Sequence, residues 1–299
     1  MSFNSALRPL KAAVLRVVER IWGLGFTASA GFVRPKIARW TSSGGHQVLI
    51  VAPHPDDEAI GCAGTALLHV GAGDRVCVAI ATDGRRSRVI PDPTEMSQCR
   101  LREAGLAAQL MRVDRFEWMG FPEGEWSVSA LRDCLKALIE QVKPDIIYAP
   151  SRIDFHPEHF KVAHTLALAL ADADDWRGRV RVYQIQVPLT PRLCNLVADV
   201  SALIPQCDGV LRAYASQAGS VRCAYRQRRY SAQIHGIAEQ AEEFWEMTGK
   251  RFMELHGTPP AQWANAFRGL RTRPFLDPLA YLVGSKERLR LHNLHPPCP

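Results

Sequence analysis

Two short polar clusters carry the residue types best suited to chemistry in this chain of 299 residues. The first is Pro53-His54-Pro55-Asp56-Asp57-Glu58 and the second is Asp154-Phe155-His156-Pro157-Glu158-His159. Imidazole nitrogens and carboxylate oxygens are good ligands for zinc and for ferrous iron. Because His54 and Asp57 are three residues apart, a bend from strand to helix can turn both toward one point. With His159 as a third ligand, the pattern predicts an open metal site with a position for water.

A simpler interpretation treats these residues as local structure. Asp56 or Asp57 could cap the helix that follows, because aspartate is favoured at helix N-termini. Capping accounts for one acid, but not for two acids beside a histidine and a glutamate, so the metal site is favoured. Two other histidines, His69 and His164, fall on predicted helices and are expected to be scaffold residues with satisfied hydrogen bonds.

The segments around both clusters alternate between strands and helices. Apolar runs predict buried strands at 47–52, 75–81, 113–119, 145–149 and 180–187, and the intervening segments predict helices at 58–70, 94–110, 131–142 and 158–171. This alternation predicts a Rossmann-like α/β fold with a mostly parallel sheet and helices on both faces. Ligands of such sheets bind at the carboxyl ends of the strands, and both clusters follow a strand directly.

Basic flanks enclose this region. Residues 1–45 carry a net charge of +6 and residues 221–299 a net charge of +5, whereas residues 46–220 carry −4. We therefore expect three parts: a basic amphipathic helix and linker over 1–45, a catalytic domain over 46–220, and a basic, helical C-terminal extension over 221–299. Four acids of the last part are expected on the outer face of a helix, namely Glu239, Glu242, Glu243 and Glu246.

The first segment has one apolar face at helical spacing, formed by Leu7, Leu10, Val14, Val17, Ile21 and Leu24. One interpretation is a helix docked on the protein's own core. The other is a helix that binds a partner or lies on an anionic membrane surface. Residues 41–45 then form a linker.

Composition excludes several classes of protein. The chain is 47% hydrophobic and 22% charged, as in globular proteins, and it has no run of 18 uncharged apolar residues that would predict a membrane span. Charges at Lys11, Arg16 and Arg20 argue against a secretory signal, and no nucleic-acid-binding signature is present. The eight cysteines form no CxxC pair, so we expect reduced thiols and no cysteine-based zinc site. A cytoplasmic protein is expected, with peripheral membrane contact through residues 1–40 as an alternative.

On these motifs the sequence resembles the PIG-L/LmbE-like metal-dependent N-deacetylases. The resemblance covers residues 46–220. Its specific elements are the His-Pro-Asp-Asp-Glu motif at 54–58 and the His-Pro-Glu-His motif at 156–159. Weaker elements follow in matching order, namely Gly61-Cys62-Ala63-Gly64-Thr65, Thr82-Asp83-Gly84, Arg100 with Glu103, and Arg212-Ala213-Tyr214-Ala215-Ser216-Gln217.

The resemblance implies a metal bound by His54, Asp57 and His159, with Zn²⁺ expected and Fe²⁺ as the alternative. It also implies a substrate that is an N-acetylated amino sugar or its conjugate, similar to N-acetylglucosamine. Arg100 is implied as a substrate contact. Glu123 stands where an aspartate often contacts the substrate, a departure that can alter sugar recognition.

Catalytic roles are implied for two further residues, Asp56 as general base and His156 as the group that stabilises the oxyanion or donates a proton. The requirements of amide hydrolysis support both roles. Asp56 is adjacent to a ligand but not needed for coordination, so it can take a proton from water and pass it to the amine. His156, three residues before ligand His159, can face the developing oxyanion as imidazolium.

Two other functions compete with the hydrolase. A non-haem Fe²⁺ oxygenase uses the same set of two histidines and one carboxylate, but Asp56 would have no role there. A non-catalytic binding protein with this fold would have no use for a base beside the metal. The motifs therefore favour the N-deacetylase.

Overall fold

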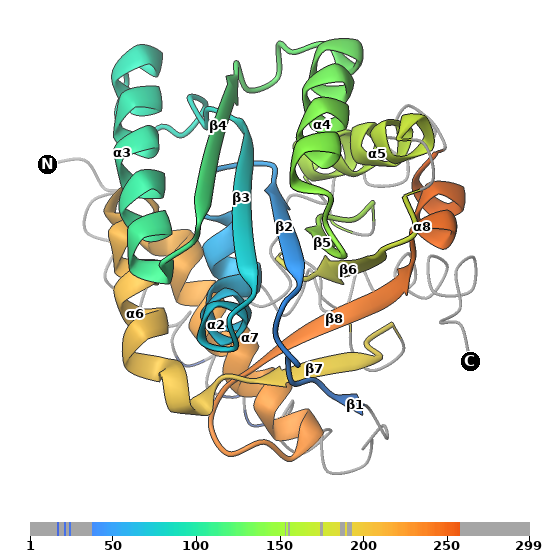
Figure 1. The fold of residues 1–299 in the computed structure, drawn as a ribbon. Helices are drawn as coiled ribbons and strands as arrows, with labels where there is room; N and C mark the ends of the chain where they lie inside the picture. The colour runs from blue at the N-terminus through green and yellow to red at the C-terminus, as the bar shows by residue number, and fades with distance from the viewer. Residues whose placement is uncertain are drawn as a thin grey trace, which may run out of the picture.

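A mixed sheet of eight strands runs through the part of the chain that the computed structural model describes. That part is residues 38–257 without 153, 155, 174–175, 186–188 and 190–192, together with Val17, Ile21 and Leu24. The strand order is β1-β7-β8-β6-β5-β2-β3-β4 (Figure 1), and every pairing is parallel except those of β8 with β6 and β7. The strands are β1 (Ala38–Arg39), β2 (Gln47–Ala52), β3 (Arg75–Thr82), β4 (Arg115–Phe121), β5 (Ile146–Ala149), β6 (Arg179–Tyr183), β7 (Leu196–Asp199) and β8 (Ala241–Thr248).

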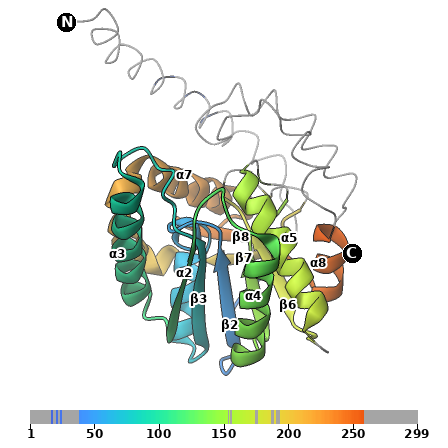
Figure 2. The same cartoon turned by 90° about the horizontal axis from the view of Figure 1, so that it is seen from above.

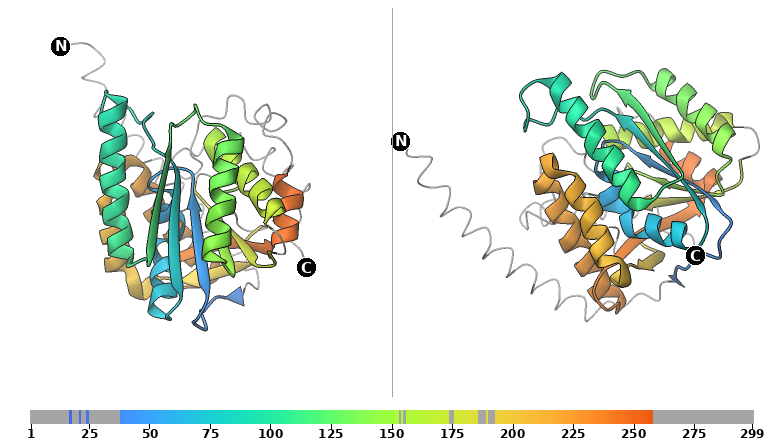
Figure 3. Two further views of the ribbon diagram at one scale, coloured as in Figure 1. Left: turned by 45° about the horizontal axis from the view of Figure 1, so that its top comes forward. Right: turned by 60° about the vertical axis from the view of Figure 1, so that its left-hand side comes forward.

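Helices cover both faces of this sheet, as the view from above shows (Figure 2). One face is covered by α4 (Val128–Val142), α5 (Pro157–Asp172) and α8 (Gly249–His256). The other is covered by α2 (Asp57–Gly71), α3 (Pro93–Met111), α6 (Ile204–Ala213) and α7 (Ala218–His235), which Figure 3 shows gathered on one side of the strands. The predicted α/β fold with helices on both faces is confirmed.

The strand β2 shows why a continuous apolar run predicts such a sheet. Val48 and Ile50 pack into the core beneath α2 and α3, whereas Leu49 and Val51 pack into the core beneath α4 and α5. Because both faces of the strand are buried from Val48 to Ala52, no position in this stretch is left for a polar side chain. The polar cluster can begin only where the strand ends, at the carboxyl edge of the sheet.

Two glycines let α2 approach its neighbours closely. A Cβ atom at Gly61 would lie 2.6 Å from the ring of Tyr183, and one at Gly64 would lie 2.5 Å from the side chain of Val200. Real Cβ atoms do not approach other atoms so closely, so a larger residue at either place would push the helix away. Gly61 and Gly64 therefore set the position of α2, which begins at Asp57.

The segment after residue 220 differs from the predicted helical extension. Helix α7 crosses the expected boundary at residue 220, and β8 lies inside the sheet between β6 and β7. The expected outer face of a helix is therefore wrong for Glu242, Glu243 and Glu246, which belong to β8, and the first two are buried. The predicted strand 180–187 is also shorter than expected, because β6 ends at Tyr183.

Three residues of the predicted N-terminal helix lie within the described part of the chain. Val17, Ile21 and Leu24 are helical, and 56%, 64% and 71% of their surface is exposed. The interpretation of a helix docked on the protein's own core is therefore wrong for these three residues. The rest of the predicted face, Leu7, Leu10 and Val14, lies outside the described residues. Among the described residues, no helix combines the length and apolar character needed to cross a membrane.

Candidate metal centre

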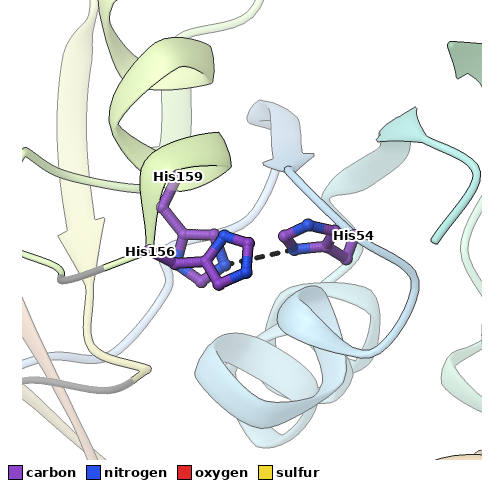
Figure 4. A group of neighbouring side chains, drawn as sticks. All are labelled: His54, His156 and His159. Atoms are coloured by element: carbon purple, nitrogen blue, oxygen red, sulfur yellow. Dashed lines mark hydrogen bonds between the residues drawn. The ribbon is translucent and has the colours of Figure 1, made fainter. Parts of the chain in front are cut away.

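The two polar clusters meet because their strands are neighbours. Strand β2 pairs with β5 in parallel, so the loops that follow them leave the sheet side by side. His54 lies in the turn between β2 and α2, and Asp57 is the first residue of α2. His159 lies in the first turn of α5, where it points toward His54 (Figure 4).

Three donor atoms form a nearly equilateral triangle. His54 Nδ1 lies 3.1 Å from Asp57 Oδ2 and 3.2 Å from His159 Nε2, and Asp57 Oδ2 lies 3.1 Å from His159 Nε2. Ligand atoms bound to one zinc ion at about 2.0–2.1 Å have similar spacings, so these residues fit a divalent metal. The predicted set of two imidazoles and one carboxylate is brought together.

A third imidazole, that of His156, lies next to those of His54 and His159 (Figure 4). Nitrogens of His54, His156 and His159 all lie within 4.8 Å of one another, which would also suit a three-histidine site. The ring of His156 stands edge-on to His54 at a centroid distance of 4.6 Å. Because Asp57 Oδ2 is 3.1 Å from both of the other ligand atoms, Asp57 fits the third ligand position better than His156 does.

Each ligand imidazole has a second carboxylate behind it. Asp154 Oδ2 lies 3.0 Å from His159 Nδ1, and Glu123 Oε1 lies 3.4 Å from His54 Nε2. Neither contact has the angles of a good hydrogen bond, so the two ring nitrogens are oriented mainly by charge. A carboxylate placed in this way favours a proton on the ring nitrogen that it faces. The other ring nitrogen, which points into the triangle, is then left to bind a metal.

The electrostatics of the site favour positive charge. Burial lowers the pKa of His54, but its interactions with the carboxylates of Asp57 and Glu123 outweigh burial and raise it to about 9. The charges of Asp57 and Asp154 likewise outweigh burial and hold the pKa of His159 well above its usual range. The same two imidazoles hold the pKa of Asp57 well below its usual range despite burial, which raises it. A bound divalent ion can supply the positive charge that these carboxylates favour.

Asp56 is held in the same turn with an unusual backbone. Its φ of 114° lies where side chains are rarely found, and strain of this kind is typical of functional sites. Its backbone N–H donates to Glu58 Oε2 at 3.2 Å, and the hydroxyl of Tyr214 donates to the other oxygen of Glu58. Arg100 Nη2 donates to Asp56 Oδ1 at 3.2 Å and also to the carbonyl of Pro55. The side chain of Asp56 is thus fixed beside the candidate metal ligands.

His156 caps the helix that carries His159. The backbone N–H of Glu158 donates to His156 Nδ1 at 3.3 Å. This bond fits a neutral imidazole with its proton on Nε2, and it does not fit the imidazolium form expected from the sequence.

A cavity of about 300 Å³ joins the predicted site residues. It is lined by all seven of them, His54, Asp56, Asp57, Arg100, Glu123, His156 and His159, and by Gly84, Arg86, Ser87, Ile185 and Gln217 among others. This volume suits a small ligand such as a single sugar ring. A larger cavity of about 950 Å³ lies near Trp40, Lys143 and Trp176, but none of the predicted site residues lines it.

Two weak sequence motifs meet beside this cavity. Glu103 accepts hydrogen bonds from the backbone N–H and the hydroxyl of Ser216, both at 2.7 Å, and Gln217 Nε2 donates to Ser87 Oγ at 2.9 Å. The Arg-x-x-Glu and Ser-Gln elements therefore build one wall together. Asp154 and Tyr214 also contribute to the site, although their positions within the two motifs did not predict a role for either.

The central part of the chain is similar to a known protein family. Residues 49–171 match the family model described as PIG-L, GlcNAc-PI de-N-acetylase. A 1D-myo-inositol 2-acetamido-2-deoxy-alpha-D-glucopyranoside deacetylase of Kineococcus radiotolerans is 27% identical over 191 residues, which cover 48% of this chain and 53% of that protein. A probable N-acetyl-alpha-D-glucosaminyl L-malate deacetylase 2 of Bacillus cereus is 32% identical over 120 residues, which cover 38% and 52%. The chain thus spans about half the length of these relatives.

The fold is shared with a solved deacetylase. The structure of N,N'-diacetylchitobiose deacetylase from Pyrococcus horikoshii superimposes with a TM-score of 0.60, covering 69% of this chain and 85% of that chain, at 21% identity. At this identity the likeness shows a common fold. The family match itself rests on residues 49–171, which contain both histidine motifs.

Proposed function

We propose that this protein is a metal-dependent N-deacetylase that acts on an N-acetylated amino sugar or its conjugate, with an N-acetylglucosamine-like ring. The observation that carries the proposal is the triangle of His54, Asp57 and His159 with Asp56 fixed beside it in one cavity. The names of the relatives support the substrate class, because each is a deacetylase of a glucosamine derivative. Zn²⁺ is the expected metal, and Fe²⁺ suits the same ligands.

A divalent ion held by these ligands would polarise the acetyl carbonyl and make a nearby water more acidic. Asp56 takes the proton from the attacking water and later passes it to the departing amine nitrogen. The ion pair with Arg100 holds the carboxylate of Asp56 at the cavity that both residues line. Hydrolysis of the amide then yields acetate and the free amino sugar.

The remaining site residues act on the substrate. His156 donates from Nε2 to the oxygen of the tetrahedral intermediate, where a fixed donor stabilises the developing charge. The Nε and Nη1 atoms of Arg100 have no hydrogen-bond partner among the described residues, so they can bind a sugar hydroxyl while Nη2 holds Asp56. Glu123 orients His54 and accepts from a sugar hydroxyl at the cavity wall.

Replacing the base tests this mechanism. Asp56→Asn keeps the shape of the side chain and tolerates the left-handed backbone, so the protein should fold and retain its metal. We expect acetate release from N-acetylglucosamine conjugates to fall by about 10²–10⁴-fold, the usual contribution of a general base. Asp92→Asn, which changes an exposed helix cap outside the cavity, is the matched control and should keep full activity. Undiminished acetate release by Asp56→Asn would refute the assigned base.

The competing functions make different predictions. An Fe²⁺ oxygenase needs oxygen and iron, whereas the proposed hydrolase works without oxygen and with zinc alone. A binding protein would release no acetate under either condition. Acetate release by the zinc-loaded protein under nitrogen therefore separates all three functions.

We also propose that the basic N-terminal segment makes a peripheral contact with anionic membrane on the cytoplasmic side. The exposed side chains of Val17, Ile21 and Leu24 support this, because they leave an apolar helix face uncovered beside several basic residues. The catalytic unit then runs from β1 at residue 38 to residue 257, because β1 and β8 both belong to the sheet, and the segment before residue 38 is its appendage. Removal of residues 1–40 should weaken binding to anionic vesicles, and equal binding would reject the anchor.

A further inference from the structure

Away from the proposed active site, a second group of metal-ligand side chains comes together. Cys194 precedes β7, His235 ends α7, and Glu243 lies in β8. One donor atom of each lies within 4.8 Å of the other two. None of the three lines the cavity of about 300 Å³, so the group is separate from the proposed catalytic residues.

The spacing of the donor atoms suits a metal ion. His235 Nε2 lies 3.0 Å from Glu243 Oε1 and 3.9 Å from Cys194 Sγ. Zinc binds sulfur at about 2.3 Å but nitrogen and oxygen at about 2.0–2.1 Å, so a longer separation to sulfur is expected. Thiolate, imidazole and carboxylate are all ligands that zinc accepts, and a thiolate disfavours magnesium and calcium.

Two buried polar atoms in this group lack partners. The side chains of His235 and Glu243 are 2% and 0% exposed, yet His235 Nδ1 and Glu243 Oε2 have no hydrogen-bond partner in the described structure. An unpaired carboxylate oxygen is costly to bury, so such an atom calls for an ion or a water. A metal ion would account for the second oxygen of Glu243, which a simple ion pair with His235 leaves unexplained.

Backbone contacts position the segments that carry these residues, and Glu243 itself is paired with Val197 in the sheet. Next to Cys194, the backbone N–H of Asn195 donates to Phe244 O at 3.1 Å, and the side chain of Asn195 bonds both backbone groups of Glu246. After His235, Gly236 adopts the left-handed conformation that ends α7. Sites whose ligands are fixed by their scaffold in this way bind a metal with little loss of side-chain freedom.

We propose that Cys194, His235 and Glu243 bind a second divalent ion, zinc by the chemistry of the donors, which ties the start of β7 to α7 and β8. Its role is structural, because it joins two neighbouring strands of the sheet to a helix and has no part in the reaction. The three ligands are separated by 40 and 7 intervening residues and include no CxxC pair. The sequence therefore contains no local motif that would predict this site.

Cobalt provides a direct test with the full-length protein. The residues proposed for the catalytic site include no thiolate, so a thiolate-to-cobalt charge-transfer band in the near ultraviolet would report the second site alone. We expect this band in the Co²⁺-loaded protein, and about two zinc ions per chain in the zinc-loaded protein by elemental analysis. A protein that holds one zinc ion and gives no such band would overturn the proposal, whatever the variants do.

Matched variants assign the signal. Cys194→Ser and His235→Asn should each lose about one zinc ion per chain, and Cys194→Ser should also lose the charge-transfer band. Cys207→Ser, which changes another buried cysteine, should keep both ions and the band. His159→Ala should lose the other ion and keep the band. A band that survives in folded Cys194→Ser would show that a different thiol binds the cobalt and would overturn the assignment.

Discussion

Two buried histidine–carboxylate groups of this protein have opposite character. In the first, His54 Nδ1, His159 Nε2 and Asp57 Oδ2 lie 3.1–3.2 Å from one another. In the second, His69 Nδ1 lies 2.5 Å from Asp74 Oδ2 and His69 Nε2 lies 2.9 Å from the hydroxyl of Tyr148. Every ring nitrogen of the second group has a protein partner, whereas the first group directs three ligand atoms at one point.

The pKa values of the histidines reflect this difference. Burial lowers the pKa of His69 to about 4, although Asp74 opposes the change, so this imidazole stays neutral. Burial acts on His54 in the same direction, yet Asp57 and Glu123 raise its pKa to about 9. The comparison teaches that burial alone does not mark a functional histidine. A functional histidine is marked by ligand atoms that converge and by surplus negative charge around them.

The largest expected effect comes from removing one imidazole from each group. His159→Ala removes a metal ligand, so metal content should fall and acetate release should drop by orders of magnitude, to the level of metal-free protein. His69→Ala should keep both metal and activity, but should lose about 1–3 kcal/mol of unfolding free energy because Asp74 and Tyr148 lose a buried partner. Metal analysis, acetate release and urea unfolding check the pair. Equal losses of activity in both variants would mean that the two groups do not differ in function.

A smaller effect is expected from the carboxylates behind the imidazoles. Asp154→Asn removes the charge 3.0 Å from His159 Nδ1, so zinc affinity should weaken by about 10–100-fold. Asp74→Asn makes the same change behind His69 and should leave zinc affinity unaltered. Competition with a chelating dye measures both affinities. An unchanged affinity in Asp154→Asn would remove Asp154 from the metal centre.

The smallest expected effect is a pH dependence of the unfolding free energy that arises from the group of His69, Asp74 and Tyr148. Because the pKa of His69 is about 4 when folded and about 6.5 when unfolded, the unfolded chain binds more protons between these values. The stability that His69 contributes is full above pH 6.5 and is lost as pH falls toward 4. The expected loss from this group between pH 7 and pH 5.5 is about 1 kcal/mol. Urea unfolding should show this loss in the wild type and a smaller one in His69→Gln, and equal losses would contradict the assignment.

The local pattern of apolar and polar residues was sufficient to predict the helices and strands around the site. The run 47–52 predicted β2 with its observed bounds, and His69 and His164 proved to be scaffold residues, with His164 Nδ1 2.8 Å from the carbonyl of His256. The pattern failed at β8, where Glu242 and Glu243 suggested a solvated helix face. Arg228 pairs with Glu242 and His235 pairs with Glu243, so both charges are buried with partners that lie elsewhere in the sequence. No local rule could have identified those partners.

The sequence by itself determined the ligand types, their spacing within each motif and the alternation of strands and helices, because these depend on residues close together in the chain. The tertiary structure alone decided which motifs meet. Parallel pairing of β2 with β5 brings His54 to His159 across 105 positions, and insertion of β8 between β6 and β7 brings Glu243 to Cys194. Strand order is set by packing over the whole sheet, so distances between remote side chains follow from the folded chain and from no segment of it.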